Sequence, residues 1–577
     1  MPREDSGETL ADLLERRAGD DRPGLLSEDR VWSWREYVAE CRERAARLDA
    51  LARKGRDGDG RAGEGQAGGG RALHVGVLFD NVPELLFLLG GAALSGHVIV
   101  ALNPTRGVAE LAGDADATDV DLILNDPGYA DLAARVTGLR APAGEGGRAG
   151  APQGTGPGDL VMLIFTSGTS GRPRAVRVTQ RKIAVPGTNL AALLSPQDVV
   201  YCSMPLFHSG AIMAAYAPAV ASGAALVLRR RFSASGLMDD VRRYGATYLH
   251  YVGKALSYVL ATPETPGDRD NTLKIAFGNE GSAAATRRFG ERFGCYVIDA
   301  FGSTETAIAI TPDPSGPPGC LGRLPEGVEI RDPAGGRCPP AVIENGRLLN
   351  GDEAIGELVN TRDLGLFDGY YNDPEADRER VRDGAFWSGD MAYADENGYV
   401  FFAGRGTERL RVDGENLAVA PIESAVREFP GVVEAAVYPV PDAEAGDQVM
   451  VAVVPEPPAG TGGARSAGGA RSAGGGGDDA VGGWDAEAVT AFAEFLAARA
   501  DLSRKALPRY VRVSAELPQT PSHKVVKRLL VAEAWRTGDP VWWRPPREPD
   551  WRRLTPEDVK QIENEFVANG REHLLER

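Results

Sequence analysis

Hydroxyl groups, glycines and arginines are concentrated in one stretch that directly follows an apolar run. The run, residues 160–165, predicts a buried strand, which typically has about four to eight apolar residues. Glycine lets backbone amides approach an anion closely, free amides and hydroxyls bind phosphate oxygens, and arginine can bind phosphate through two parallel hydrogen bonds. The stretch comprises Thr166, Ser167, Gly168, Thr169, Ser170, Gly171, Arg172 and Arg174. It predicts a phosphate-binding loop, and a polar surface loop is the alternative. The Gly-Lys-Ser/Thr of the common nucleotide loop does not follow at the required spacing.

Short apolar runs alternate with helix-like stretches on both sides of this loop. Before it, residues 74–79, 98–102 and 122–124 predict strands, and residues 83–94 predict a helix. Residues 8–52 have apolar side chains at helical spacing and predict helical structure. Strands that alternate with helices predict an α/β fold with a mostly parallel, doubly wound sheet. Further strand-like runs lie at residues 199–202, 225–228, 247–251, 273–277 and 295–298.

The length of the chain, 577 residues, exceeds what one hydrophobic core usually serves, so at least two domains are expected. Short strands and Gly-Asp turns over residues 320–403 predict a β-rich subdomain, which closes a large N-terminal domain at residues 1–404. The pattern resets after Arg405, and residues 405–537 predict a compact α+β domain. Within it, residues 459–483 are glycine-rich and predict a flexible insertion.

Residues 538–577 predict a C-terminal extension that ends in a helix. Thr555 and Pro556 are typical of a helix start, and Asp558 lies three residues after the threonine, as in a capping box. Val559, Ile562 and Phe566 would form the apolar stripe of this helix. Docking of the helix onto the body of the protein is expected, and a partner surface is the alternative.

Composition narrows the class of protein. The net charge of −18 argues against nucleic acid or an anionic membrane as the main partner. Five scattered cysteines without a CxxC pair indicate neither a disulfide framework nor a zinc site. The N-terminus lacks the pattern of a signal peptide, and Ser95, Gly96 and His97 interrupt the apolar residues 85–102. No transmembrane segment is therefore predicted, and the expected location is cytoplasmic.

Six separated motifs, in this order and spacing, resemble those of the adenylate-forming superfamily of acyl-CoA synthetases, adenylation domains and luciferases. The resemblance extends from about residue 8 to residue 535, and within it the chain resembles the fatty-acid transport protein and very-long-chain acyl-CoA synthetase branch, especially actinobacterial fatty-acid–CoA ligases. The motifs are Thr166–Arg174, Met204-Pro-Leu-Phe-His208, Phe301-Gly-Ser-Thr-Glu305, Trp387-Ser-Gly-Asp390, Gly404-Arg405 with Gly414-Glu-Asn416, and Pro518-Gln-Thr-Pro-Ser-His-Lys524.

The resemblance implies an ATP-dependent ligase that joins an acid to the α-phosphate of ATP and releases pyrophosphate. Thr166–Arg174 would hold the β- and γ-phosphates, Thr304 would donate to the α-phosphate, and Glu305 with Thr166 would bind Mg²⁺. The implied nucleotide contacts are Phe301 and Gly302 at the adenine, Asn279 or Asp299 at its amino group, Asp390 at the ribose, and Arg405 at the ribose or a phosphate.

Lys524 is the expected catalytic lysine by resemblance, carried by the mobile C-terminal domain to the reacting carboxylate and α-phosphate. A solvated surface lysine is the ordinary alternative at such a position. His208 would border the acid pocket or be a packed core residue, and Lys254 would face that pocket or begin a helix. Gly414, Glu415 and Asn416 lie in the loop that the family turns toward the site for thioester formation.

The resemblance implies a second step in which a thiol attacks the acyl-adenylate, and this thiol would come from outside the chain, since no cysteine lies in a motif. Coenzyme A is expected, with a fatty or related acid as the substrate. The alternative is a non-fatty small acid, including nitrite-type activation for diazotisation, with transfer to an amine or carrier protein. A third hypothesis is a nucleotide-binding scaffold without catalytic activity. The sequence also leaves a homodimer open.

Several residues depart from the family pattern. Arg174 stands where lysine is common, so the charge is kept, and His523 replaces the glycine before the reactive lysine. Thr306 follows Glu305 where the branch usually has glycine, and its side chain could narrow the acid pocket. None of these changes removes a required charge. Adenylation is therefore better supported than the identity of the acid.

Overall fold

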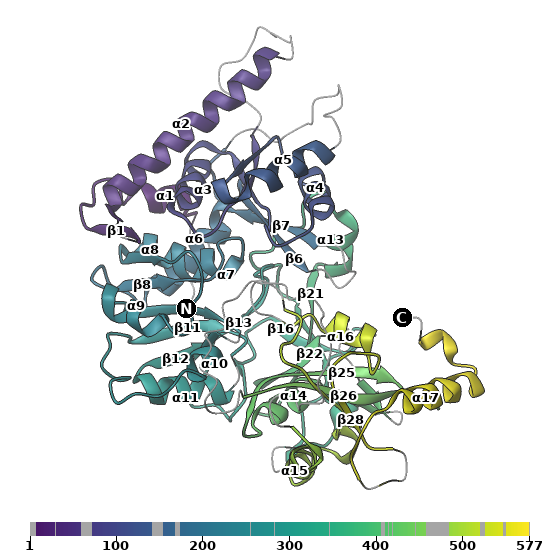
Figure 1. Ribbon diagram of the computed structural model, residues 1–577. Coiled ribbons are helices and arrows are strands. Elements are labelled where there is room, and N and C mark those ends of the chain that lie inside the picture. The colour runs from purple at the N-terminus through teal and green to yellow at the C-terminus, as the bar shows by residue number, and fades with distance from the viewer. Residues whose placement is uncertain are drawn as a thin grey trace. The chain divides into compact units, whose positions relative to one another are not determined.

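The computed structural model divides the chain into two compact units (Figure 1). Unit 1 comprises Met1–Gly281, Ala285–Pro312 and Asn360–Ser388; unit 2 comprises Ser282–Ala284, Asp313–Val359 and Gly389–Arg577. The structure describes residues 7–28, 30–58, 72–140, 154–167, 173–253, 255–281, 283–344, 347–405, 410–412, 415–417, 419–444, 446–456, 484–519, 525–545, 548 and 550–575. The glycine-rich insertion, residues 459–483, lies outside the described residues.

The first sheet of unit 1 carries the strand that leads into the predicted phosphate-binding loop. Its order is β5-β3-β4-β6-β7, and all neighbours are parallel except β6 and β7. The bounds are β3 (His74–Leu78), β4 (Val98–Ala101), β5 (Leu122–Asn125), β6 (Leu160–Ser167) and β7 (Pro173–Thr179). Every residue of β3 and β4 is buried, as expected for strands covered on both faces.

The second sheet of unit 1 has the order β12-β11-β10-β8-β9-β1-β2 and is parallel apart from the β1–β2 pair. The bounds are β1 (Pro23–Ser27), β2 (Arg30–Ser33), β8 (Val199–Cys202), β9 (Ala225–Leu228), β10 (Tyr248–Val252), β11 (Ile275–Asn279) and β12 (Tyr296–Asp299). The mostly parallel α/β prediction is confirmed for this unit. Continuous helical structure over residues 8–52 was wrong, because β1 and β2 interrupt it. Pro23 and Gly24 break the helix there, and a Cβ at Gly24 would lie 2.6 Å from the Trp34 ring.

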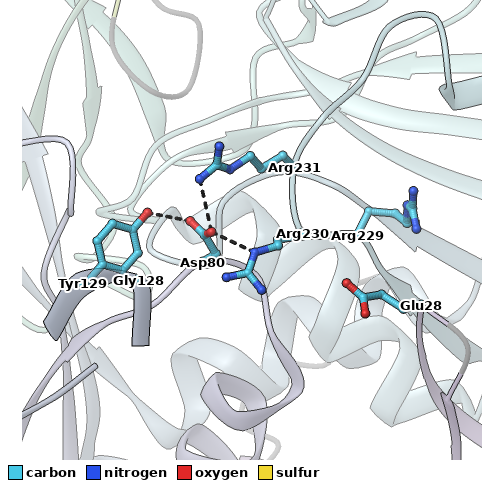
Figure 2. A pocket seen from close by; sticks show the side chains of 7 residues that line it. All are labelled: Glu28, Asp80, Gly128, Tyr129, Arg229, Arg230 and Arg231. Carbon is cyan, nitrogen blue, oxygen red and sulfur yellow. Dashed lines mark hydrogen bonds and ion pairs between the residues drawn. The ribbon is translucent and has the colours of Figure 1, made fainter. Parts of the chain in front are cut away.

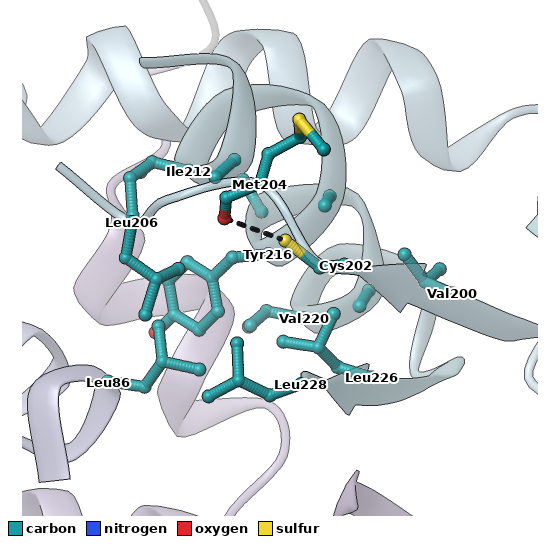
Figure 3. Packing of buried hydrophobic residues seen from close by; sticks show 14 of the residues in the cluster. Leu86, Val200, Cys202, Met204, Leu206, Ile212, Tyr216, Val220, Leu226 and Leu228 are labelled. Atoms are coloured by element: carbon teal, nitrogen blue, oxygen red, sulfur yellow. Dashed lines mark hydrogen bonds between the residues drawn. The ribbon is translucent and has the colours of Figure 1, made fainter. Parts of the chain in front are cut away.

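Helices α3, α6 and α8 join the two sheets of unit 1 through one apolar cluster. Figure 3 shows part of it: Leu86 of α3 lies beside Tyr216, and Cys202 of β8 and Leu228 of β9 belong to the same cluster. Each fully buried leucine contributes about 1.5–3 kcal/mol. The helices of unit 1 are α1 (Leu10–Glu15), α2 (Trp34–Gly58), α3 (Pro83–Ser95), α4 (Val108–Ala117), α5 (Ala130–Leu139), α6 (Gln180–Ala191), α7 (Ser209–Ala211), α8 (Ala217–Ser222), α9 (Leu237–Tyr244), α10 (Ala255–Leu260), α11 (Ala283–Phe293) and α13 (Pro374–Arg380).

Most strands of a further, six-stranded sheet belong to unit 2. The strand pattern of residues 320–403 predicted this β-rich region. The order of the sheet is β15-β22-β21-β19-β16, with β20 paired to β21. The bounds are β15 (Gly322–Arg323), β16 (Val328–Arg331), β19 (Gly356–Asn360), β20 (Val381–Arg382), β21 (Ala385–Ala394) and β22 (Tyr399–Arg405). Two short strands lie in unit 1, β13 (Phe301–Gly302) and β14 (Ala309–Ile310). The short elements of unit 2 are β17 (Ile343–Glu344), β18 (Arg347–Leu348), α12 (Gly351–Ala354), β23 (Leu410–Val412) and β24 (Glu415–Leu417).

The C-terminal part of unit 2 is a five-stranded sheet with helices, β25-β26-β27-β28-β29. The last two strands and α17 come from the extension, and α17 begins with the predicted capping box between Thr555 and Asp558. Ile562 and Phe566 of α17 are buried in the apolar cluster of this sheet, so the extension docks on its own chain. The bounds are β25 (Val432–Pro441), β26 (Asp447–Pro455), β27 (Tyr510–Val513), β28 (Val541–Trp543), β29 (Arg552–Arg553), α14 (Val419–Arg427), α15 (Ala486–Ala497), α16 (Lys527–Glu533) and α17 (Pro556–Ala568).

A buried carboxylate connects α14 to α16 in unit 2. Glu423 is 9% exposed, accepts a hydrogen bond from the Val437 amide at 3.2 Å, and pairs with Lys527 at 2.7 Å and with Arg427. Burial alone would raise the pKa of Glu423, but Lys527 and Arg427 lower it to about 2. Because this pKa lies below the unfolded value of 4.5, the stabilisation is complete above pH 4.5. It is lost as the pH falls from there through about 2.

We expect Glu423→Gln to lower the free energy of unfolding by about 3–5 kcal/mol at pH 7, because it leaves two partly buried cations, Lys527 and Arg427, without their buried counter-charge. The difference from the unmodified protein should shrink between pH 4.5 and pH 3, where Glu423 begins to bind a proton in the unfolded chain. Urea unfolding at several pH values measures both effects. Glu428→Gln is the control, since that side chain is 44% exposed and its pair with Arg499 is worth under about 1 kcal/mol. A loss below 1 kcal/mol at Glu423 would contradict the prediction.

Candidate active site

The predicted phosphate-binding loop leaves the sheet at one end of the β6–β7 hairpin. Thr166 pairs with Arg174, and Ser167 with Pro173, so the described strands fix both ends of the loop. Thr166 is partly buried at the end of β6. Gly168, Thr169, Ser170, Gly171 and Arg172 lie outside the described residues, so their binding of phosphate stays a prediction.

Arg174 is buried between a carboxylate and a ring. Its guanidinium pairs with Glu379 of α13 and lies 5.5 Å from the centre of the Tyr370 ring, and the residue is 7% exposed. A cation held in this way keeps its charge near the loop. A phosphate that binds Arg174 therefore competes with Glu379 for the guanidinium.

The Phe301–Glu305 motif forms a turn that several distant side chains hold. Phe301 and Gly302 form β13, and a Cβ at Gly302 would meet no atom within 4 Å. The Thr304 hydroxyl lies 3.0 Å from the Ser209 hydroxyl at the start of α7. Glu305 accepts a hydrogen bond from the Tyr370 hydroxyl at 2.9 Å, and its carbonyl oxygen accepts one from Lys182 Nζ at 2.9 Å.

The residue after this turn is strained. Thr306 has a φ of 57°, which is unusual for a β-branched residue and costs about 1–3 kcal/mol. Its hydroxyl lies 3.2 Å from the Thr304 carbonyl oxygen and 3.8 Å from Met213 Sδ. Strain of this size persists only where the surroundings over-determine the backbone. The turn is therefore held in a set conformation.

Electrostatics keep Glu305 ionised. Burial raises the pKa of its carboxyl, but a backbone amide, the Tyr370 hydroxyl and Arg380 outweigh burial and lower it. Lys182 is fully buried, and burial lowers its pKa to about 8. Glu305 is thus a carboxylate at neutral pH, as a ligand of a hard cation must be. Among the described residues, no group of three His, Cys, Asp or Glu side chains is placed to hold a metal ion.

The two candidate partners of the adenine amino group differ in their hydrogen bonds. Asp299 Oδ2, at the end of β12, accepts from the Tyr251 hydroxyl at 2.6 Å and the Gly281 amide at 2.7 Å, and burial raises the pKa of Asp299 to about 6. Asn279 Oδ1, at the end of β11, is buried and has no hydrogen-bond partner in the described structure. A buried amide oxygen without a donor fits an amino group from a ligand. Asn279 Oδ1 therefore has an unused acceptor position, whereas Asp299 Oδ2 already accepts two hydrogen bonds.

Asp390 and Arg405 face each other across the β21–β22 pair of unit 2. They are partners in the strand register, and Arg405 Nε lies 3.5 Å from Asp390 Oδ1. Asp390 is 7% exposed and Arg405 is exposed. The pairing of the two strands thus brings together two residues that the sequence assigned to the nucleotide.

The remaining predicted residues are described in part. The His208 ring lies 4.7 Å from the Phe207 ring, centre to centre, and precedes α7, which agrees with either interpretation of this residue. Lys524, Lys254 and Gly414 lie outside the described residues. Glu415 and Asn416 lie in β24, and only their backbone is described.

Two family models match the chain in sequence: AMP-binding enzyme over residues 14–371, and the AMP-binding enzyme C-terminal domain over residues 421–524. The chain belongs to the AMP-binding enzyme family.

The relatives of this AMP-binding enzyme include CoA ligases that match nearly end to end. Steroid-22-oyl-CoA synthetase of Rhodococcus jostii is 40% identical over 98% of this chain and 99% of its own. A medium/long-chain-fatty-acid–CoA ligase of Mycobacterium tuberculosis is 44% identical over 92% and 98%. The solved anthranilate CoA ligase AuaEII, in complex with anthranoyl-AMP, has a TM-score of 0.73 at 19% identity over 92% and 98% of the two chains, and supports the fold. The predicted superfamily and enzyme class, an ATP-dependent acid–CoA ligase, are confirmed.

Sequence reasoning missed the side chains that support Glu305 in this AMP-binding enzyme. Lys182 and Tyr370 lie 123 and 65 residues away from it in the chain. A lysine in the first turn of a helix and a tyrosine after a glycine are ordinary features, so neither carries a signal by itself. Only the packing of α6 and of residues 360–388 around the turn identifies them.

A second missed feature is a basic hollow in unit 1, with a volume of about 550 Å³. Figure 2 shows Arg230 and Arg231 on one side of Asp80, with Tyr129 on the other. Asp80 accepts hydrogen bonds from Tyr129 at 2.7 Å and from the two arginines at 3.0 and 3.3 Å. Arg229 also lines the hollow, and the Arg231 side chain is 71% exposed. The run of three arginines was the available signal.

The described part of the AMP-binding enzyme contains no helix that is both long enough and apolar enough to cross a membrane.

Proposed function

We propose that this AMP-binding enzyme activates a medium- or long-chain fatty acid, or a steroid side-chain acid, with ATP and transfers the acyl group to coenzyme A. In the first step the carboxylate attacks the α-phosphorus, pyrophosphate leaves, and acyl-AMP forms. In the second step the thiol of coenzyme A attacks the acyl carbonyl, and AMP leaves. The observation that carries the proposal is the Thr304–Glu305 turn, with an ionised carboxylate held by Tyr370. The class of acid comes from the relatives, which act on fatty and steroid acids.

The residues of the turn neutralise charge where two anions must meet. Thr304 would donate a hydrogen bond to the α-phosphate, and Glu305 with Thr166 would hold Mg²⁺. The cation supplies Lewis-acid stabilisation of the phosphate charge when bound. Asn279 accepts from the adenine amino group through the oxygen that has no protein donor. The phosphate-binding loop and Arg174 hold the departing pyrophosphate, which aligns the reacting atoms.

The thiol of the second step comes from outside the chain. Burial raises the pKa of Cys41, Cys202 and Cys295 to about 12, so these thiols are poor nucleophiles at neutral pH. Coenzyme A brings its own thiol and several phosphates. We infer that the hollow lined by Arg229, Arg230 and Arg231 binds these phosphates.

An acid panel tests the function. Purified protein is assayed for ATP–pyrophosphate exchange and for CoA-dependent AMP release with fatty acids of increasing length, steroid side-chain acids, aryl acids and short acids. We expect both activities with the fatty or steroid acids. Exchange without CoA-dependent release would favour a carrier protein or an amine as acceptor. Failure with every acid would reject the proposal, and activity with short acids or nitrite alone would favour the alternative substrate class.

Arg231→Gln tests the site for coenzyme A. We expect the KM for CoA to rise about tenfold, since one charge-assisted hydrogen bond is worth about 1.5–3 kcal/mol. Pyrophosphate exchange should not change. Pantetheine, which has the thiol without the phosphates, is the control and should have the same KM with both proteins. An equal rise in the KM for pantetheine would show that Arg231 does not act through the phosphates of coenzyme A.

Other features stay predictions from sequence. The domain boundaries at residues 404 and 537 are proposed from composition and motifs. The cytoplasmic location, a carrier-protein partner and a homodimer also remain to be tested. Gel filtration with light scattering measures the last of these.

A further inference from the structure

One fully buried lysine in unit 1 has no role in the reaction derived so far. Lys182 lies in the first turn of α6 and is 0% exposed. Its Nζ donates to the Glu305 carbonyl oxygen at 2.9 Å and lies 5.8 Å from the centre of the Phe367 ring. A lysine is almost never buried without a specific partner. Its partner here is the backbone of the residue that would bind the cation.

Burial disfavours the Lys182 ammonium and lowers its pKa to about 8, and neighbouring carboxylates partly offset this effect. Glu305 and Asp368 attract it, and Arg181 repels it. Asp368 is itself held by the Thr179 hydroxyl at 2.7 Å and by Arg181 at 2.5 Å. Residues of α6 and of the segment 360–388 thus both place charges that act on Lys182, while its hydrogen bond goes to the Glu305 carbonyl.

The carbonyl that Lys182 holds belongs to the residue just before the strained Thr306. A strained backbone relaxes unless the groups on either side are fixed. Tyr370 fixes the Glu305 side chain, and Lys182 fixes its carbonyl. Together they account for how the turn keeps its unusual conformation.

We propose that Lys182 is a positioning residue for adenylation, which holds the strained Glu305–Thr306 backbone so that the Glu305 carboxylate keeps the orientation needed for cation binding. This inference rests on the proposed function. Lys182 touches neither substrate nor cofactor in this role, and acts through Glu305. It sets how tightly the enzyme binds the metal–nucleotide complex and how fast the adenylate forms.

Lys182→Met removes the donor and keeps the length of the side chain. We expect the Mg²⁺ concentration for half-maximal pyrophosphate exchange to rise about tenfold, and kcat to fall about tenfold. Gln180→Leu is the matched control: Gln180 is also 0% exposed, lies two residues earlier on α6, and bonds the Ala93 carbonyl and the Ala11 amide. This control should lower the melting temperature and leave the Mg²⁺ dependence unchanged.

The double variant Lys182→Met/Thr306→Gly tests the mechanism. Glycine adopts a positive φ without strain, so we expect it to recover at least threefold of the activity lost in Lys182→Met. Additive effects of the two changes would overturn the proposal, as would a Lys182→Met protein with the Mg²⁺ dependence of Gln180→Leu. If the methionine variant does not fold, Lys182→Gln, which keeps a neutral donor, takes its place. Its Mg²⁺ requirement should exceed that of Gln180→Leu at least threefold, and equality would overturn the proposal.

The design separates this inference from the function on which it rests. If the unmodified protein shows no exchange with any acid, the proposed function fails. Calorimetry without an acid then measures the affinity of each Lys182 variant for Mg²⁺ with ATP. We expect affinity about tenfold weaker for Lys182→Met than for Gln180→Leu, and equal affinity would overturn the role of Lys182.

Discussion

Glu305→Gln should lower ATP–pyrophosphate exchange by about 10²–10³-fold, the loss expected when one preorganised stabiliser of transition-state charge is removed. Glutamine has nearly the same shape and still accepts a hydrogen bond from Tyr370, but it lacks the negative charge that a hard cation prefers. The turn should therefore keep its conformation while the cation binds poorly. Exchange measured over a range of Mg²⁺ concentrations distinguishes weaker binding of the cation from slower chemistry.

Tyr370→Phe is the companion variant for this measurement. It removes one hydrogen bond to the Glu305 carboxylate and leaves the charge, so we expect a loss of only about three- to tenfold. If Glu305→Gln were no worse than Tyr370→Phe, the carboxylate would have a structural role and no part in binding the cation.

Lys524→Ala should lower adenylation by about 10²–10³-fold, because its ammonium would offset negative charge at the reacting carboxylate and α-phosphate. The described residues on either side of it form a closed base: Gln519 pairs with Val525, and the Val526 amide donates to the Pro518 carbonyl at 2.7 Å. Removal of a side chain beyond this base should leave the fold intact. Pyrophosphate exchange measures the effect directly.

Lys560→Ala is the control for Lys524, since Lys560 is an exposed lysine on α17 of the same unit. It should retain full exchange and the same melting temperature. A fall of less than threefold in pyrophosphate exchange for Lys524→Ala would contradict a catalytic role and favour an ordinary surface lysine.

The sequence predicted most of the fold because the main signals are local. Alternation of apolar runs with helix-like stretches identified β3, β4, β8 and β9, and Thr555 with Asp558 identified the start of α17. β1 and β2 were not predicted, because their residues lie in a stretch with helical spacing. β1 also pairs with β9, about 200 residues away along the chain. Non-local pairing of this kind leaves little local pattern.

The site divides in the same way. Thr304 and Glu305 were predicted because their motif resembles that of a known family, and their roles stay predictions. Lys182 and Tyr370 were not found, since each reaches Glu305 only through tertiary packing. The structure adds what spacing could not give: Asp299 Oδ2 already accepts a hydrogen bond from Tyr251, whereas Asn279 Oδ1 has no donor among the described residues.

The C-terminal extension covers one edge of the C-terminal sheet, which bears on how the chain can be shortened. Without β28 and β29, β27 would present unpaired backbone groups beside Tyr510, which stacks on Trp535 and Trp543. Exposed edges of this kind recruit other chains and promote aggregation. The strand that ends the sheet has only two residues, Arg552 and Arg553, and both are charged and exposed. A tag after α17 should be tolerated. Truncation at residue 538 would expose β27 as an edge strand and promote aggregation.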